Sequence, residues 1–565
     1  MLFAPSTAKS VKIRTLYAVI YLFLALGAIT MIAPFLIMLS GSVEPRAQAG
    51  DTLFFPAYLV NDDALWQRYL ETRYHGLNEL LRMSWDDGSA NFRGISRRAA
   101  PSTDPALVPL WKQFLAETPL PEEFFTLGFM RPNVRMPSYT TMVFRTWLME
   151  KYGSLEGVNQ ALGTSFRRPT EITPPLIRMD SPPLPDTPLV KEFFAFSATQ
   201  PPARKFAWNV GAFYRANVLP RIVGADIATY NQRFGTAFRN FTEVPFPATV
   251  PEIGTEPWVF FVTRLLRTDF VEITPAGRTR MESLNLRKVE FIRTQARPEE
   301  LQIVSADTRF ARWAADRGIA DARIPQQALD DETFAKEKGF WKTQFLTLNY
   351  RYVLDEITGH GGAIRNTVIL IVLSIAGTLL VNPLAAYALS RYKMKASYHI
   401  LLFCLATIAF PAEVTMIPIF LQLREFNLLN TFGALVLPGL ANGFSIFLLK
   451  GFFDSLPREL YEAAEIDGAN EWVTFWNISM NLSKPILAVI ALDVFVSAYG
   501  SFFYALILAP DPAMWTLMVY IYQLRQGVAP PVVYASLIIT AVPTLIIFVA
   551  CQGIILRGIV VPSEK

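Results

Sequence analysis

The sequence predicts an all-α polytopic membrane protein with six transmembrane helices and a large domain, mixed but mainly helical, inserted between the first and second helices. Two observations lead to this fold class. Six apolar runs are long enough to cross a bilayer, and a long, mostly polar section (46–345) separates the first run from the other five. The composition agrees, because 52% of the residues are hydrophobic and the mean hydropathy is +0.28 despite that section.

The first span is predicted from Leu16 to Leu39, after basic residues at Lys9, Lys12 and Arg14. About 24 helical residues are enough to cross a hydrocarbon core of about 30 Å. A cleavable signal peptide is the alternative interpretation. The run is too long for that and lacks a small-x-small exit, so we expect an uncleaved first span.

The other five spans are predicted from apolar runs in the second part of the chain, at Ile364–Leu389, Tyr398–Leu423, Thr431–Phe453, Pro485–Ala509 and Val532–Leu556. Basic residues gather in loops on one side of these spans, at Arg391, Lys393, Lys395, Lys450, Arg458 and Lys484. The positive-inside rule therefore predicts that both termini are cytoplasmic and that residues 46–345 are extracytoplasmic. The predicted domains are 1–45 with the first span, the inserted domain 46–345, and a five-helix core 346–565.

The inserted domain is expected to fold, because its tryptophans, among them Trp66, Trp111, Trp147 and Trp208, can build a core. It also contains a repeat. The motif Asn-Gln-x-x-Gly-Thr-x-Phe-Arg-x-x-Thr-Glu begins at Asn159 and again at Asn231, in modules of about 144–175 and 213–247. We expect the Asn and Thr to close turns, the glycine to adopt a positive φ, and the Phe to pin the loop to a core.

The segment 455–485, here called the elbow, predicts a short helix, a sharp bend and a second helix. Pro457 is tolerated in a first helical turn, and Ser455 is expected to cap the orphan amides of that turn. Gly468 can take a left-handed stop, and the second helix is expected to begin near Asn470. The elbow is thus a polar connection between two membrane spans.

One face of the first elbow helix carries Leu460 and two alanines, which leave room for another backbone to approach. Around this face, Glu462-Ala463-Ala464 is followed by Asp467-Gly468-Ala469. This pattern resembles the EAA loop of the membrane-spanning permease subunits of ABC importers. The resemblance implies that these six residues belong to a coupling helix, which lies in a cleft on the ATP-hydrolysing subunit.

The resemblance extends along the second part of the chain, through Leu346-Thr-Leu-Asn-Tyr350, Asn366-Thr367 and Gly451-Phe-Phe-Asp-Ser-Leu-Pro457. These landmarks are similar to the maltose and oligosaccharide branch of the family. The chain departs from the family at Met480-Asn481, which predicts an altered entry angle for the next span, and at Tyr499-Gly500, where the branch commonly has Trp-Asn.

The resemblance implies a permease subunit of an ATP-driven importer for sugars or oligosaccharides, in a bacterial inner membrane. It also implies the partners: ABC ATPase subunits, a second homologous permease and an extracytoplasmic solute-binding protein, with membrane lipid around the spans. The chain itself has no Gly-x-x-x-x-Gly-Lys-[Ser/Thr] phosphate loop, so ATP and Mg are expected to be used by the ATPase partner. The chain is therefore expected to be no enzyme.

Other chemistry is not expected from the composition. The basic residues are dispersed, which argues against nucleic-acid binding. Cys404 and Cys551 both lie in apolar runs and cannot build a disulfide framework or a zinc site, and three scattered histidines suggest no metal or catalytic triad. We expect the chain to bind neither a cofactor nor a metal ion.

Polar residues within the spans are candidates for the solute pathway: Asn382, Glu413, Asp493, Ser497 and Tyr499. A charged group in hydrocarbon costs several kcal/mol unless it faces a cavity or a partner. These residues either line a passage or tie neighbouring helices together, and the sequence leaves both interpretations open.

A second function stays open for the inserted domain. The stretch from Trp147 to Phe166 resembles a helical segment of some β-galactosidase-type hydrolases, so a membrane-anchored protein that binds or hydrolyses glycans is the alternative. Its adjacent acids, at Glu122-Glu123 and Asp330-Asp331-Glu332, point in different directions on a helix or strand. We therefore expect them to be solvated surface, and expect binding or docking rather than hydrolysis. A secondary carrier would usually show inverted repeats of spans instead.

Overall fold

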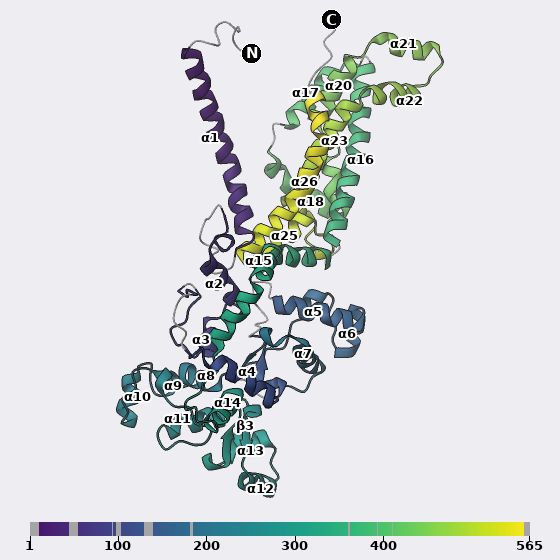
Figure 1. The fold of residues 1–565 in the computed structure, drawn as a ribbon. Helices are drawn as coiled ribbons and strands as arrows, with labels where there is room; N and C mark the ends of the chain where they lie inside the picture. Colours follow the sequence, from purple (N-terminus) through teal and green to yellow (C-terminus); the bar gives the residue numbers. More distant parts are fainter. Residues whose placement is uncertain are drawn as a thin grey trace. The chain divides into compact units, whose positions relative to one another are not determined.

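The computed structural model describes residues 11–44, 55–92, 94–97, 103–128, 139–180, 185–359, 362–392, 394–408 and 411–558. The chain forms two compact units (Figure 1). The first unit comprises residues 1–352 with a short piece at 529–532, and the second comprises 353–528 with 533–565. The polar part of the first unit, residues 55–345, is called the polar domain below.

Helices dominate the first unit, and the part of it that the structure describes contains two small antiparallel sheets, β1 (Phe125–Thr126) with β2 (Phe206–Ala207) and β3 (Val271–Ile273) with β4 (Leu301–Ile303). Its helices are α1 (Val11–Gly41), α2 (Asp62–Arg73), α3 (Asn78–Trp85), α4 (Leu107–Glu117), α5 (Tyr139–Tyr152), α6 (Leu155–Leu162), α7 (Pro188–Thr199), α8 (Val210–Phe213), α9 (Leu219–Ile222), α10 (Ile227–Phe234), α11 (Thr255–Phe260), α12 (Pro275–Ser283), α13 (Lys288–Thr294), α14 (Ala306–Ala315) and the start of α15 (Gln326–Gly359). The expected mixed, mainly helical composition is confirmed.

Aromatic side chains build the core of the polar domain. The ring of Trp66 lies 5.0 Å from that of Phe334 and 5.5 Å from that of Tyr69, which in turn packs 5.4 Å from Trp341. Such offset and edge-to-face pairs join α2 to α15, more than 260 positions later in the chain. The predicted folded core is therefore present, and it is one continuous cluster of buried residues from Val43 to Phe345.

The chain that leaves α1 meets the middle of α15. The Asn349 side-chain amide donates to the Ser42 carbonyl at 2.8 Å, and the hydroxyls of Ser42 and Tyr350 lie 2.6 Å apart. Beside them the buried Arg68 guanidinium stacks between the rings of Tyr58 and Phe345, at 4.3 and 4.4 Å, and burial lowers its pKa to about 10. The two ends of the polar domain therefore lie at one point of the first unit.

Both copies of the repeated motif have the same geometry. The Asn159 side-chain oxygen accepts from the Thr164 hydroxyl at 2.9 Å and from the Phe166 backbone amide at 2.8 Å. The Asn159 side-chain nitrogen donates to the Phe166 backbone carbonyl at 2.8 Å. Asn231 makes the three equivalent bonds at 2.8, 3.0 and 2.8 Å. The glycines that precede the loops have φ of 65° and 67°. The predicted turn-closing role of this motif is confirmed.

Asp330 corrects one expectation about the acidic residues. The sequence predicts a solvated surface, but the Asp330 side chain is fully buried. It accepts from the Arg73 guanidinium at 2.8 Å, from the indole of Trp85 and the amide of Gln326, each at 2.8 Å, and from the Tyr74 hydroxyl. Four donors bind one carboxylate, so this buried polar group is fully hydrogen-bonded and paired inside the core.

The helices of the second unit are mostly apolar: α16 (Gly362–Arg391), α17 (Ser397–Ile408), α18 (Ala412–Glu425), α19 (Phe432–Val436), α20 (Gly443–Asp454), α21 (Arg458–Ile466), α22 (Glu471–Thr474), α23 (Lys484–Tyr499), α24 (Phe503–Leu508), α25 (Leu517–Gly527) and α26 (Pro530–Gly558). α16 packs against α20 and α23. Figure 1 shows α21 and α22 as an arm at one end of these helices.

Interrupted helices replace several of the predicted uniform spans. Within the described residues, three helices are long and apolar enough to cross a membrane alone, at Thr15–Gly41, Gly362–Arg391 and Pro530–Gly553, and bent pairs raise the number to as many as five. The predicted span Tyr398–Leu423 is divided into the 12-residue α17 and α18, with Pro411 at the start of α18. The predicted span Pro485–Ala509 is divided as well, because α23 ends at Tyr499. The structure confirms several apolar helices, and the count of six stays a prediction.

Candidate functional site

The elbow folds as a helix, a glycine turn and a second helix. α21 begins at Arg458, directly after Pro457, whose extended backbone (φ −54°, ψ 133°) ends the preceding turn. The bend occurs at Gly468, which has a φ of +76°. The Asn470 side chain then accepts from the Val473 amide at 2.9 Å and caps α22, as expected.

The expected role of Ser455 is wrong. The sequence predicts that its hydroxyl caps the start of the elbow helix, but the hydroxyl donates to the Phe452 carbonyl at 2.7 Å. It thereby satisfies an orphan carbonyl at the end of α20. The start of α21 has no side-chain cap, because Pro457 occupies that position.

The outer face of the elbow is exposed. Of the six residues in the predicted coupling pattern, Glu462, Ala463, Asp467 and Gly468 are exposed and Ala469 is half-buried, whereas Ala464 is only 8% exposed. Apolar side chains share the exposed surface, since Ile466 is 85% exposed and Leu460 is also exposed. Exposed apolar side chains within a polar rim are typical of a protein contact.

The inner face of the elbow is anchored to the membrane helices. The Tyr461 hydroxyl lies 2.8 Å from that of Ser479, and the Arg391 guanidinium lies 3.4 Å above the Tyr461 ring. At the second elbow helix, the Tyr387 hydroxyl donates to the Glu471 carboxylate at 2.7 Å. Tyr387 and Arg391 are both on α16, so these contacts anchor the elbow to a membrane helix.

Sequence reasoning missed these anchors. From the sequence, Arg391 indicates only the orientation of the membrane spans. The Tyr387–Glu471 contact joins residues 84 positions apart, and a single sequence gives no signal for it. After the elbow, the helical segment Glu471–Met480 meets α23 at 81°, so the chain turns sharply where Met480-Asn481 stands.

The predicted pathway residues lie at different contacts. Asn382 on α16 is fully buried, and its side-chain oxygen accepts from the Asn442 amide at 2.9 Å. Asn442 caps α20 at a break where Phe432–Gly439 meets α20 at 49°. The break is tight, because a Cβ on Gly443 would lie 2.1 Å from the Cys404 carbonyl oxygen. Asn382 therefore supports irregular backbone at the depth of the apolar helices.

The other pathway residues lie on α23 or outside the described side chains. Tyr499 is buried, and its hydroxyl donates to the Thr540 carbonyl on α26 at 2.6 Å, so it ties two helices together. Asp493 and Ser497 are one helical turn apart on α23, and both are exposed. Glu413 is on α18, but its side chain lies outside the described part of the chain.

No metal centre forms where the structure describes the chain, since no three His, Cys, Asp or Glu side chains gather there as possible ligands. The described contacts instead hold the elbow against the membrane helices. The arrangement comprises an exposed arm, anchored by hydroxyl and guanidinium contacts to a long membrane helix, and interrupted helices beside it.

Comparison with known proteins identifies this arrangement. Residues 381–560, which include the elbow, match the family described as "Binding-protein-dependent transport system inner membrane component". The chain is 31% identical over 235 residues to the protein LplC of Bacillus subtilis, covering 38% of this chain and 78% of that protein. It is 35% identical over 205 residues to the sulfoquinovosyl glycerol transport system permease protein SmoH of Agrobacterium fabrum, covering 35% and 72%.

A third relative has a similar extent. The arabinooligosaccharides transport system permease protein AraQ of Halalkalibacterium halodurans is 29% identical over 227 residues, covering 39% of this chain and 80% of the relative. The matches thus cover most of each relative and little more than a third of this chain, which leaves the polar domain largely outside them. The chain belongs to the family of binding-protein-dependent transport system inner membrane components, and is a multi-pass permease subunit of an ABC importer.

Proposed function

We propose that this permease imports a carbohydrate and that its elbow is the contact through which ATP hydrolysis in a separate subunit drives transport. One observation carries the coupling role: the elbow is anchored on its inner face and exposed on its outer face. The partners are a pair of ABC ATPase subunits, a second homologous permease and an extracytoplasmic solute-binding protein. ATP and Mg bind to the ATPase subunits, and this chain needs no cofactor of its own.

The contact residues are Glu462, Ala463, Asp467 and Gly468, with Ala464 and Ala469 packed behind them. The neighbouring alanines give a matched pair for a test, because Ala463 is exposed and Ala464 is buried. In a chain whose two cysteines are replaced by serine, Ala463→Cys should crosslink to the ATPase subunit with a short bifunctional reagent and Ala464→Cys should not. Equal yields from both positions, or none from Ala463→Cys in an active transporter, would contradict the contact.

The carbohydrate assignment is supported by two of the relatives, of which one is a transport system permease for sulfoquinovosyl glycerol and the other a transport system permease for arabinooligosaccharides. ATPase activity of the reconstituted transporter should rise when the solute-binding protein is loaded with a sugar or oligosaccharide. Stimulation by amino acids or metal ions, and none by a panel of saccharides, would show that the solute belongs to another class.

The proposed topology has six spans, cytoplasmic termini and an external polar domain. The basic residues at Arg391 and Lys450, near the elbow, support this orientation, and α17 with α18 supplies the sixth crossing as an interrupted span. Reporter fusions should be active in the cytoplasm after Arg391 and outside it after Asn427, in the loop that follows α18. The reverse pattern, or cytoplasmic activity at both positions, would exclude this topology.

The polar domain is proposed to be a module inserted at one point of the permease, between the first and second spans. Its ends meet where Ser42 contacts Asn349 and Tyr350, and this contact supports the insertion. The domain is further proposed to dock or orient the solute-binding protein with its external loops. Deletion of residues 57–339 should reduce ATPase stimulation by the binding protein while the chain still assembles with its ATPase. Unchanged stimulation and uptake would rule out the docking role.

Hydrolysis by the polar domain is disfavoured by the environment of its acids. Asp330 is buried beneath four donors, so it is not available as a general acid or base for a substrate. Its neighbours Asp331 and Glu332 form ion pairs with Arg97 and Lys112, respectively. A retaining or inverting glycosidase needs two acids that face each other across the substrate.

For the solute pathway we propose Asn382, at the broken helix, and the exposed pair Asp493 and Ser497 on α23. Glu413 and Tyr499 are kept as candidates, although the Tyr499 hydroxyl already binds Thr540. Asp493→Asn should change which saccharides are transported, or their KM, with little effect on ATPase assembly. An unaltered uptake profile in Asp493→Asn and Ser497→Ala would assign both residues to helix or lipid contacts.

A further inference from the structure

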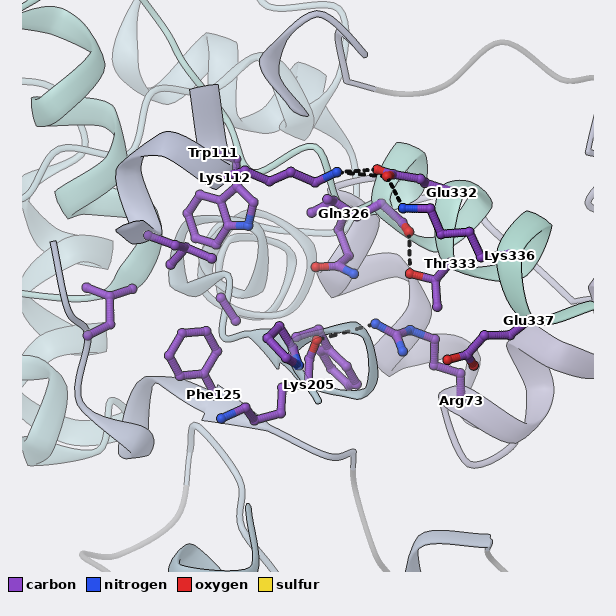
Figure 2. Close-up of a pocket in the computed structure, with 16 residues that line it drawn as sticks. Arg73, Trp111, Lys112, Phe125, Lys205, Gln326, Glu332, Thr333, Lys336 and Glu337 are labelled. Atoms are coloured by element: carbon purple, nitrogen blue, oxygen red, sulfur yellow. Dashed lines mark hydrogen bonds and ion pairs between the residues drawn. The ribbon is translucent and has the colours of Figure 1, made fainter. Parts of the chain in front are cut away.

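The polar domain contains a cavity of about 430 Å³ between α4, the β1–β2 pair and the start of α15 (Figure 2). Aromatic and apolar side chains form much of its lining, among them Trp111, Phe125 and Phe206. Its volume falls within the range of about 300–1,000 Å³ that is usual for small-molecule sites. All of its lining residues belong to the first unit and lie outside the family match at 381–560.

The charges around the cavity balance one another. Each of the four cations in the lining is bound by a carboxylate, in the pairs Lys112–Glu332 (2.6 Å), Lys336–Glu332 (2.7 Å), Arg73–Asp330 (2.8 Å) and Lys205–Glu122 (2.9 Å). Glu337, also in the lining, adds a fourth carboxylate and accepts the indole N–H of Trp341 at 3.0 Å. Glu332 and Glu337 belong to the lining, and Asp330 and Glu122 bind lining cations from behind it, so four carboxylates offset four cations and the cavity favours a neutral ligand.

One hydrogen-bond acceptor points into the cavity without a partner. Gln326 is only 4% exposed, and its amide nitrogen donates to the Asp330 carboxylate at 2.8 Å. That contact fixes the orientation of the amide, because a flipped Gln326 would turn its oxygen against a carboxylate. No described residue donates to the Gln326 side-chain oxygen, which Figure 2 shows on the side of the amide that faces Trp111.

One hydrogen-bond donor points into the same space. Trp111 is also only 4% exposed, and its ring packs against Phe114 and Phe310 at 5.5 and 5.1 Å. Its indole N–H has no hydrogen-bond partner in the part of the chain that the structure describes. Figure 2 shows this nitrogen on the edge of the ring that faces Gln326. Both atoms belong to buried side chains and border the cavity, so a ligand hydroxyl can take the hydrogen bonds that water would otherwise make there.

We propose that this cavity binds a neutral saccharide, in which one hydroxyl accepts from the Trp111 indole and donates to the Gln326 side-chain oxygen. A hydroxyl is the group that can do both at once. The apolar face of the sugar ring packs against the aromatic rings of Phe125 and Phe206, while its other hydroxyls reach the paired charges at the rim. The site goes beyond the proposed transport function, because it gives the polar domain a ligand of its own.

Binding is tested with the full-length chain in lipid nanodiscs, without its partners, by saturation-transfer NMR and calorimetry. The probes are maltotriose and arabinotriose as neutral saccharides, trigalacturonate as a charged one, and decanoate as an apolar ligand. Trp111→Phe keeps one aromatic ring and removes the N–H together with the five-membered ring that carries it, so saccharide affinity should fall about tenfold. Leu115→Trp, from a half-buried lining position, should fill the cavity and abolish binding.

The matched control is Trp147→Phe, at a half-buried tryptophan on α5 that packs on Phe144 and Phe196 away from the cavity lining. It should bind the saccharides as the natural chain does, and thermal unfolding checks that all variants fold. The proposal is overturned if neither neutral probe binds at millimolar concentration, or if Trp111→Phe and Leu115→Trp both bind like the control. It is also overturned if decanoate or trigalacturonate is the ligand that Leu115→Trp excludes.

This test is separate from the transport proposal. Carbohydrate uptake by the complete transporter, with saccharide binding unaffected by the cavity variants, would remove only the cavity site. Saccharide binding that depends on Trp111 in a transporter that carries no carbohydrate would remove only the transport assignment.

Discussion

Replacing Gly468 gives the sharpest test of the elbow. Its φ of +76° lies in the region that side chains with a Cβ rarely adopt, yet a Cβ placed there would meet no other atom within 4 Å. The effect of a substitution is therefore conformational and not steric. An L-residue in this region costs about 1–2 kcal/mol, whereas Asn tolerates the region better than other residues. That free energy corresponds to about a 5- to 30-fold decrease in the population of the bent elbow.

The assay is binding-protein-stimulated ATPase activity, measured beside uptake in proteoliposomes that contain all subunits. Activity should fall in the order Gly468→Asn, Gly468→Ala, Gly468→Val, with the Val variant about 5- to 30-fold below the natural chain. The Asn variant is the matched control, since it adds a side chain at the same position. Full stimulation and uptake with Gly468→Val would refute the reasoning, because the bend would then be dispensable.

Three further predictions concern other contacts. Asn159→Ala and Asn231→Ala should each lower the free energy of opening of their own loop by about 2–3 kcal/mol, because each removes three hydrogen bonds of the same geometry. Faster local hydrogen exchange would measure this change, and an effect in only one of the two loops would contradict their equivalence. Desolvation lowers the pKa of His75, so protonation favours the unfolded state, and stability present above pH about 6.5 should be lost as the pH falls below it. Thermal unfolding in a pH series should show this loss, and His75→Gln should remove it; a variant with the same pH dependence would contradict the assignment. Tyr387→Phe removes the hydroxyl that donates to Glu471, a hydrogen bond worth about 1.5–3 kcal/mol. It should lower uptake more than Tyr461→Phe, which removes a contact between neutral hydroxyls. Unchanged uptake by the Tyr387→Phe transporter would show that this contact is not needed for transport.

The elbow could be predicted from the sequence because its shape is encoded locally. Gly468 permits the bend and Asn470 caps the next helix within three residues, so no distant partner is needed. The turns after Asn159 and Asn231 follow the same logic, since each asparagine binds groups no more than seven residues away. The prediction for Ser455 was wrong because a hydroxyl between two helices can cap either one, and the local sequence does not decide which.

Long-range contacts could not be predicted in this way. Asp330 lies among consecutive acidic residues, a pattern that predicts an exposed side chain. Only the fold brings Tyr74 and Trp85 to it, from about 250 positions earlier in the chain. The cavity combines Trp111 with Gln326, and neither residue has a sequence neighbour that marks it as a ligand. Hydropathy also overestimated the regularity of the spans, because it averages over breaks such as the one that Asn382 stabilises at Asn442.

The exposed apolar side chains of the elbow bear on how long the subunit persists in the cell. Ile466 and Leu460 remain in contact with water until another protein covers them. If the elbow binds an ATPase subunit as proposed, a newly made copy without that subunit displays an exposed apolar patch of the kind that chaperones and proteases recognise. Surplus copies should then be degraded faster than assembled ones, so the supply of the ATPase subunit sets how much of this permease survives.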